Sequence, residues 1–335
     1  MSAAPPPRTP AAPLAGAGRP VTTPLEPHAA TTLARLLAAD RKFLWGLAYR
    51  ITGSAADADD VVQDAFARAL AQPPERLDEP LRPWLVRVTS RLSIDVLRRR
   101  RRHSYVGPWL PSPVDESWLE QGPQGARYDA RESVTLVFLL ALEALPPKAR
   151  AVLVLRDVLD LDVAETAAAL QMTESNVKVT HLRVRQKLAM YDTARVDTSP
   201  AAQVRVQGVL NQLLMAVSTG DVATVAALLS PDVVLLSDGG GQYLAERKPV
   251  HGAKSVSLFI VKTSRKQSAV QVVPSWLVLA GLPTLHLQVD RPPPGLAPAL
   301  TVSITLDSDG RVACLYYVLA DRKLTAALPY RRPVD

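Results

Sequence analysis

The stretch DVAETAAALQMTESNVKVTHLRVRQKL, residues 162–188, has the pattern of two helices joined by a tight turn. Its apolar side chains recur at three- and four-residue intervals on both sides of residues 171–173, which is the spacing of one buried helix face. The positions of this pattern are Val163, Thr166, Ala167, Leu170, Met172, Val177, Val184 and Leu188. The pattern predicts a helix-turn-helix, a unit that commonly places its second helix on DNA.

The second of these helices has the chemistry of a DNA-reading helix. Cations hold phosphates, whereas Asn, Ser, Thr and Arg can also read base edges. The helix offers Ser175, Asn176, Lys178, Thr180, Arg183, Arg185 and Lys187. His181 follows Val177 by four residues and is expected to be a packed histidine and not a ligand.

A second basic helix is predicted at residues 84–102, where it ends in five consecutive arginines and also presents Arg87 and Arg91. Cations are favoured at any helix C-terminus and a charge run is often only a solvated face, so for this run alone both interpretations stay open. Two helices precede it, at 31–49 and from 55 to about 70, and the second carries Asp57, Asp59 and Asp60 in its first turn. Two basic helical modules on one chain favour a DNA bound at two places.

Length and composition limit the class of protein. A chain of 335 residues with a net charge of +7 predicts two or three domains. The single Cys314 excludes an internal disulfide, and no Cys/His spacing predicts a metal site, so neither metal nor cofactor is expected. The longest apolar run, residues 134–142, is far shorter than the roughly 20 residues of a membrane span, and we expect a cytoplasmic protein without membrane contact.

The rest of the chain divides by composition. Residues 1–29 are proline-rich and predict a disordered leader that is not an export signal, and residues 30–104 predict a first helical domain. A linker at 105–128, which contains Trp109 and Trp118, leads to the helix-turn-helix domain at 129–192. After a linker at 193–203, residues 204–325 predict an α+β domain with helices first and an antiparallel sheet after, followed by a tail at 326–335.

The stretches LAYRITGSAADADDVVQDAFARAL and PWLVRVTSRLSIDVLRRRRR resemble region 2 of bacterial sigma factors of the extracytoplasmic-function (ECF) type. LEALPPKARAVLVLRDVLDLDVAETAAALQMTESNVKVTHLRVRQKL resembles region 4 of the same family. The linker phrase YVGPWLPSPV and the later SDGGG are similar to the sigma-J-like group, in which a SnoaL-like cone of the NTF2 superfamily follows region 4. The resemblance implies a mainly α chain with a C-terminal α+β cone, and a transcription initiation factor that binds core RNA polymerase and promoter DNA.

The resemblance also implies roles for particular residues. Contact with the polymerase β′ coiled coil falls on Asp59, Asp60, Gln63, Asp64 and Phe66. Helix capping is the other interpretation of Asp57 and Asp59, but it does not explain Gln63 and Asp64 further in. Minus-ten DNA is assigned to the loop at 72–83 and to Arg87, Arg91, Asp95, Arg98, Arg99, Arg100, Arg101 and Arg102. Arg91 stands where many such factors carry Asn, so the base preference does not transfer.

For region 4, the resemblance implies minus-35 DNA and the polymerase β flap as partners. The residues that would approach the DNA are Ser175, Asn176, Lys178, Val179, Leu182, Arg183 and Arg185. In the C-terminal domain the resemblance implies regulation in cis through the linker and the glycine loop. These residues are Trp109, Leu110, Pro111, Asp238, Gly239, Gly240, Gly241 and Gln242.

Two departures and two alternatives remain in the C-terminal domain. Gln242 replaces the lysine of the DGGGK motif, and an asparagine-proline motif is replaced by residues 320–324, ADRKL, so a cation is lost at one contact and gained at another. Turn chemistry alone also explains Asp238 and the glycines that follow it. An enzymatic alternative, a small-molecule cyclase or isomerase tethered to a DNA-binding module, would draw acid–base groups from Asp238, His251 and His286, with Tyr243 nearby. A small ligand in the pocket is compatible with either function, and a plain helix-turn-helix regulator is disfavoured because it has no use for the acidic helix.

Overall fold

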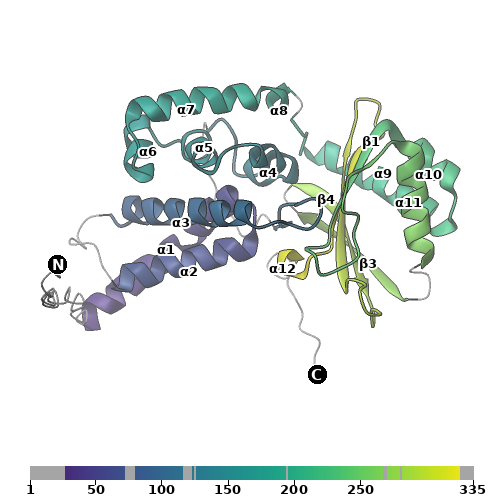
Figure 1. The fold of residues 1–335 in the computed structure, drawn as a ribbon, viewed down its shortest axis with the longest axis horizontal. Coiled ribbons are helices and arrows are strands. Elements are labelled where there is room, and N and C mark those ends of the chain that lie inside the picture. The colour runs from purple at the N-terminus through teal and green to yellow at the C-terminus, as the bar shows by residue number, and fades with distance from the viewer. Residues whose placement is uncertain are drawn as a thin grey trace, which may run out of the picture.

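The computed structural model describes residues 27–71, 80–115, 123, 126–193, 195–266, 270–279 and 281–324. The predicted leader and tail therefore lie almost entirely outside the described residues, as do Trp118 and residues 72–79 of the proline-rich loop. Two helical domains lie one above the other, and a domain built on a sheet lies at one end of both (Figure 1). None of the described helices is long and apolar enough to cross a membrane.

The N-terminal helical domain consists of α1 (Pro27–Thr52), α2 (Ala55–Ala71) and α3 (Arg82–Arg102). The three helices pack on one another along the apolar faces that the periodicity predicts, with Leu44, Leu47 and Leu85 fully buried. Gly53 separates α1 from α2 with a φ of +69°, a backbone conformation that favours glycine.

The second helical domain contains the predicted helix-turn-helix, which the structure confirms as α6 (Val163–Leu170) and α7 (Glu174–Lys187). Asp162 and Glu165 form a reciprocal capping box at the start of α6, and Gln171 takes the left-handed conformation that ends it. Thr173 then caps α7 through a bond from the Asn176 amide. The supporting elements are η2 (Glu132–Val134), α4 (Leu136–Glu143), α5 (Pro147–Leu153), η3 (Val154–Val158) and α8 (Ala189–Thr193).

The C-terminal domain is the predicted α+β cone. It contains α9 (Pro200–Thr219), α10 (Val222–Leu228), β1 (Leu229–Asp238), β2 (Val250–His251), α11 (Ala253–Lys266), β3 (Val272–Leu279), β4 (Leu282–Val289), β5 (Ala299–Leu306), β6 (Val312–Val318) and α12 (Asp321–Leu324). The sheet order is β2-β1-β6-β5-β4-β3, and α9, α10 and α11 lie on one side of it (Figure 1).

The expectation of an antiparallel sheet is wrong at one place, because β1 and β6 pair in parallel. The chain leaves β1, passes through β2 and α11, enters the sheet again at the far edge and returns strand by strand to β1. A parallel pair needs such a long crossover connection. Neither α11 nor β2 was among the elements expected from the sequence.

The hydrophobic interior shows how the three domains are joined. One continuous core runs through both helical domains, and a second fills the cone between the sheet and its helices. A third, smaller cluster joins them, and it contains Leu110 of the linker, Leu136 of α4, Tyr316 and Val318 of β6 and Leu324 of α12. The linker therefore lies between the cone and the helical domains, where the regulatory residues were expected.

A buried ionic cluster joins the three domains

Asp238, at the end of β1, is fully buried and is the centre of this junction. Its Oδ1 accepts hydrogen bonds from the Tyr105 hydroxyl at 2.5 Å and from the Gly240 amide at 3.0 Å. Its Oδ2 accepts from the Leu110 amide at 2.7 Å and pairs with the Lys323 ammonium of α12. We call Asp238, Tyr105, Leu110, Gly240 and Lys323 the Asp238 cluster.

Lys323 supplies the cation that a buried carboxylate needs. Its ammonium also donates to the Leu110 carbonyl, and it lies 4.3 Å from the Trp109 ring centroid and 5.0 Å from that of Tyr105. Burial lowers the pKa of Lys323 to about 8, although the adjacent Asp238 carboxylate acts in the opposite direction. Burial and the hydrogen bond to Asp238 raise the pKa of Tyr105, so its hydroxyl stays a neutral donor.

The glycine loop after β1 obeys the predicted turn chemistry and also serves the cluster. Gly240 and Gly241 have φ values of +62° and +72°, and Gly240 donates its amide to the carboxylate of Asp238. A Cβ on Gly239 would lie 2.6 Å from the Tyr243 carbonyl oxygen, so no larger residue fits. Gln242 is exposed, and the cation of the cluster comes from Lys323, in the segment where the sequence gains one.

The linker fixes the cluster to the N-terminal helical domain. Leu110 and Pro111 are buried, and the next residue, Ser112, donates its amide to the Gly53 carbonyl at 2.9 Å. The hydroxyl of Tyr49 donates to the Ser112 carbonyl at 2.6 Å. Nine residues, 105–113, thus touch the cone on one side and the α1–α2 junction on the other.

Part of the arginine run lies at the interface between the two helical domains. Arg100 donates to both carboxylate oxygens of Glu143 at 3.0 Å, and its guanidinium lies 3.8 Å from the Trp109 ring centroid. Arg101 donates to the Glu143 and Leu145 carbonyls. Protein acceptors thus occupy the guanidiniums of Arg100 and Arg101 in this conformation, and the assignment of these two residues to phosphates stays a prediction.

The other residues assigned to minus-ten DNA lie along α3. Arg98 forms an exposed pair with Asp95 at 3.0 Å, which costs little to break. Arg87, Arg91, Arg99 and Arg102 are exposed.

The residues assigned to the polymerase lie on α2. Asp60, Gln63 and Asp64 are exposed, whereas Phe66 packs partly against the core. Asp59 is half-buried, and burial raises its pKa although a bond from Trp45 opposes this shift. A polar face with two carboxylates, Asp60 and Asp64, and the amide of Gln63 therefore remains open on α2.

The seven residues assigned to minus-35 DNA all lie exposed on α7, and none contacts the C-terminal domain through a bond among the described residues. Arg185 also has a structural partner, because it binds Asp157 of η3 at 2.6 Å. The expected packing of His181 is confirmed in part: it is half-buried, and its Nε2 lies 2.8 Å from Asp157 Oδ1. Burial would raise the pKa of Asp157, but His181 and Arg185 outweigh it and hold the pKa below its usual value.

The cone encloses an apolar cavity, and the residues proposed for catalysis do not reach it. Ser237 lines the cavity, so Asp238, the next residue of β1, points to the opposite face of the sheet. His286 is likewise placed between two lining residues of β4 and bonds to Ser275, and His251 is exposed on β2. The enzymatic alternative, which alone placed these residues in the pocket, therefore loses its acid–base candidates.

Some of the residues that build the interface were not predicted from the sequence. Tyr105 opens the linker phrase and Glu143 lies in the stretch that resembles region 4, but neither was assigned a role, and Lys323 was noted only as an added cation. Their partners are distant along the chain: Tyr105 and Asp238 are separated by 133 residues, and Lys323 and Asp238 by 85. The available signal was their position, because Tyr105 stands in the linker phrase and Lys323 stands in the altered C-terminal segment.

Comparison with known proteins identifies the family to which the chain is similar. The profile of Sigma-70 region 2 matches residues 36–103, and that of Sigma-70 region 4 matches residues 135–188. ECF RNA polymerase sigma factor SigJ of Mycobacterium tuberculosis is 34% identical over 224 residues, which cover 66% of this chain and 70% of SigJ. Probable ECF RNA polymerase sigma factor SigI of the same species is 32% identical over 200 residues, covering 58% of this chain and 66% of SigI. The crystal structure of SigJ superposes with a TM-score of 0.62 at 27% identity, covering 88% of this chain and 99% of that structure.

Proposed function

Because this chain belongs to the ECF family of RNA polymerase sigma factors, we propose that its C-terminal domain holds regions 2 and 4 in a closed state that cannot engage a promoter. The sigma function itself is to direct core RNA polymerase to promoters and initiate transcription. The proposal concerns how one chain switches that function off and on. The Asp238 cluster is the observation that carries it.

Distances on DNA support a closed state. Elements named minus-35 and minus-ten lie about 25 base pairs apart, which is roughly 85 Å of duplex at about 3.4 Å per base pair. In this structure α3 packs against α6, and α6 packs against α7. Packed helices lie about 8–10 Å apart, so α7 is within roughly 20 Å of α3. The two DNA-binding helices cannot read both elements without separating.

Contacts between the helical domains also oppose promoter binding. Glu143 of region 4 neutralises Arg100 of region 2, in the run assigned to minus-ten phosphates. Arg150, which is also buried, pairs with the same carboxylate and donates to the Arg50 carbonyl at 3.2 Å. Releasing Arg100 to DNA therefore requires that regions 2 and 4 part.

The Asp238 cluster stabilises this packing of regions 2 and 4 through the C-terminal domain. Tyr105 and Leu110 belong to the segment that links regions 2 and 4, whereas Asp238 and Lys323 belong to the cone. Because removing one partner of a buried ion pair leaves an uncompensated charge, the cluster resists partial opening. The cone thus holds the linker, and the linker holds region 2.

The polar face of α2 supports an order of events. Asp60, Gln63 and Asp64 are exposed in the closed state and are three of the five residues assigned to the β′ coiled coil. We infer that core polymerase binds α2 first, with region 4 reaching the β flap and promoter DNA after the domains separate. A closed factor would then still be captured by core polymerase.

The test is Lys323→Ala, with Arg322→Ala as its matched control. Arg322 is the exposed neighbour on α12, so the control removes a cation from the same helix without touching Asp238. Lys323→Ala is expected to raise promoter-specific transcription by about tenfold or more at limiting factor, because the promoter-competent fraction rises. Arg322→Ala is expected to behave as the unmodified chain. Equal transcription from both variants, with circular dichroism showing both folded, would contradict the proposal.

A further inference from the structure

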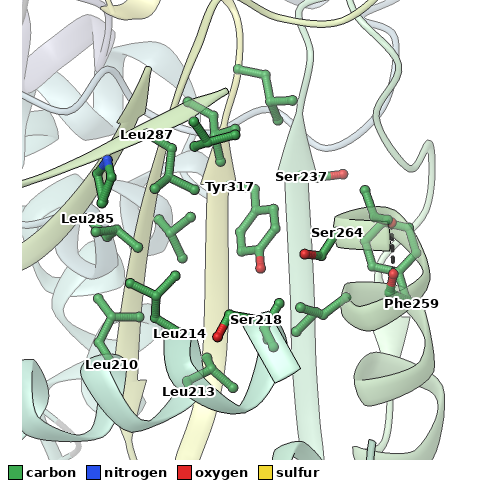
Figure 2. A pocket seen from close by; sticks show the side chains of 18 of the residues that line it. Leu210, Leu213, Leu214, Ser218, Ser237, Phe259, Ser264, Leu285, Leu287 and Tyr317 are labelled. Atoms are coloured by element: carbon green, nitrogen blue, oxygen red, sulfur yellow. Dashed lines mark hydrogen bonds between the residues drawn. The ribbon is translucent and has the colours of Figure 1, made fainter. Parts of the chain in front are cut away.

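The C-terminal domain encloses a cavity of about 350 Å³ between the sheet and helices α9 and α11. Leu210, Leu213 and Leu214 of α9 form one wall, and Phe259 of α11 forms another (Figure 2). The strands contribute Leu285 and Leu287 of β4, Val302 of β5 and Tyr317 of β6. The volume is at the lower end of the roughly 300–1,000 Å³ of small-molecule pockets.

The cavity wall carries no formal charge. Among the described residues that line it, none is Asp, Glu, Lys, Arg or His. An ionised ligand would lie unpaired in apolar surroundings, which costs several kcal/mol or more. The cavity therefore favours a neutral, mostly apolar occupant.

The hydroxyls of the wall differ in what they can offer a ligand. Ser218 donates to the Met215 carbonyl at 2.8 Å, Thr263 donates to the Phe259 carbonyl at 2.7 Å, and Ser237 accepts from the Glu246 amide at 2.9 Å. The hydroxyls of Tyr317 and Ser264 have no hydrogen-bond partner among the described residues, and the Tyr317 ring lies amid the lining side chains in Figure 2. Burial raises the pKa of Tyr317, so the phenol remains a donor.

We propose that the cavity binds a neutral lipophilic molecule with a hydrogen-bond acceptor that receives the Tyr317 hydroxyl, and that it binds this molecule best in the closed state. The first part depends on the cavity alone. The second part rests on the proposed function.

The preference for the closed state follows from shared backbone. Ser237 and Tyr317, which line the cavity, are partners in the β1–β6 register, and Asp238 and Val318 are the next pair. Leu319 also lines the cavity, and its amide donates to the Asp238 carbonyl at 2.8 Å. Opening the Asp238 cluster frees the segment that leads from Leu319 to Lys323, which loosens one wall of the cavity.

The experiment is a fluorescence titration of the full chain with prodan, a neutral naphthalene ketone whose emission shifts to the blue in apolar surroundings. Leu214→Trp fills the cavity from α9, and Met215→Trp places the same ring on the exposed side of that helix. Saturable binding to the unmodified chain and to Met215→Trp, with at least about tenfold weaker binding to Leu214→Trp, is expected. Absence of saturable binding, or equal binding to both tryptophan variants, would overturn the site.

Tyr317→Phe tests the polar contact without filling the cavity. Loss of one hydrogen bond is expected to weaken prodan binding by about 3- to 10-fold. N-phenyl-1-naphthylamine, a neutral probe without a carbonyl, is expected to bind both chains equally. If Tyr317→Phe weakens the binding of both probes equally, the proposed hydrogen bond from the hydroxyl is refuted. This test does not depend on whether Leu214→Trp folds.

Lys323→Ala tests the preference for the closed state. Binding and opening are linked reciprocally, so opening the cluster is expected to weaken prodan binding by about fivefold or more. Unchanged prodan binding to Lys323→Ala, together with raised transcription, would refute the preference and leave the proposed function standing. Unchanged transcription together with weakened prodan binding would refute the proposed function and leave the site standing.

Discussion

Replacing Asp238 by asparagine is the most direct perturbation of the closed state. The side chain keeps its shape but loses its charge and one of its two acceptor oxygens. In the native cluster each carboxylate oxygen accepts from two donors, Oδ1 from Tyr105 and Gly240 and Oδ2 from Leu110 and Lys323. Whichever way the amide turns, its NH₂ group faces two donors, and the Lys323 ammonium faces a neutral group.

The expected cost follows from burial, because Asp238 is 0% exposed and Lys323 is 7% exposed. Removing one partner from a buried ion pair costs about 3–5 kcal/mol. Since about 1.4 kcal/mol changes an equilibrium tenfold, the ratio of closed to open molecules should fall by about two to three and a half orders of magnitude. A solvent-exposed pair would give less than about one order.

Amide hydrogen exchange measures this change in the closed-to-open ratio at single backbone amides. The Leu110 amide bonds to Asp238 Oδ2, so its protection reports the closed state. Asp238→Asn is expected to accelerate exchange at Leu110 by about 100-fold or more, whereas Asp232→Asn, an exposed change on the same strand, leaves it unaltered. Amides in the middle of β4, such as Leu285, report whether the cone remains folded. Unchanged protection at Leu110 in Asp238→Asn would refute the reasoning.

Three further predictions follow from other contacts. Changing the exposed Arg99 and Arg102 to alanine should reduce the slope of log promoter affinity against log salt by about 1.5, measured by anisotropy of the holoenzyme, because two phosphate contacts are lost. Gly239→Ala should destabilise the C-terminal domain by about 1–3 kcal/mol in urea unfolding, because its Cβ would meet the Tyr243 carbonyl at 2.6 Å. Because the pKa of Asp157 is lowered in the folded state, its carboxylate contributes its full share of the free energy of unfolding above about pH 4. This contribution is lost as the pH falls through the folded-state pKa. The free energy of unfolding of Asp157→Asn in urea should therefore depend less on pH below about pH 4 than that of the unmodified chain.

Elements with strong local patterns were predictable. The starts of α6 and α7 are marked within a few residues by the capping residues Asp162 and Thr173 and by the apolar spacing. This is possible because a cap and the helix face that follows it are formed by residues close together in the sequence. The loop after Asp238 was predictable as a turn for the same reason: the acceptor and the glycines that it serves are adjacent.

Contacts between distant segments were not predictable in this way. Nothing in one sequence connects Tyr105 or Lys323 to Asp238, because such pairs arise only when the sheet has brought β1 and β6 side by side. The parallel β1–β6 pair was missed because strand spacing gives the existence of strands but not their order.

The enzymatic alternative placed Asp238 in the pocket, and a physical reason explains why the sequence could not exclude this placement. Alternation along a strand normally separates a wet face from a buried one, and the polar residue then marks the outside. At the end of β1 both Ser237 and Asp238 are buried, because the cone covers one face and the linker covers the other. The polarity of Ser237 and Asp238 therefore did not indicate which of the two residues faces the cavity.

The two departures from the family pattern describe one arrangement of charge. A fully buried carboxylate requires a cation, and the exposed Gln242 cannot supply one. Lys323 does so from α12, a helix that directly follows the cavity-lining Leu319 and the β6 strand. The cation that fastens the linker therefore sits on the same segment that walls the cavity. A ligand of the kind proposed for the cavity would, by moving this wall, also move the partner of Asp238, and this shared segment is the physical basis of the proposed coupling to the closed state.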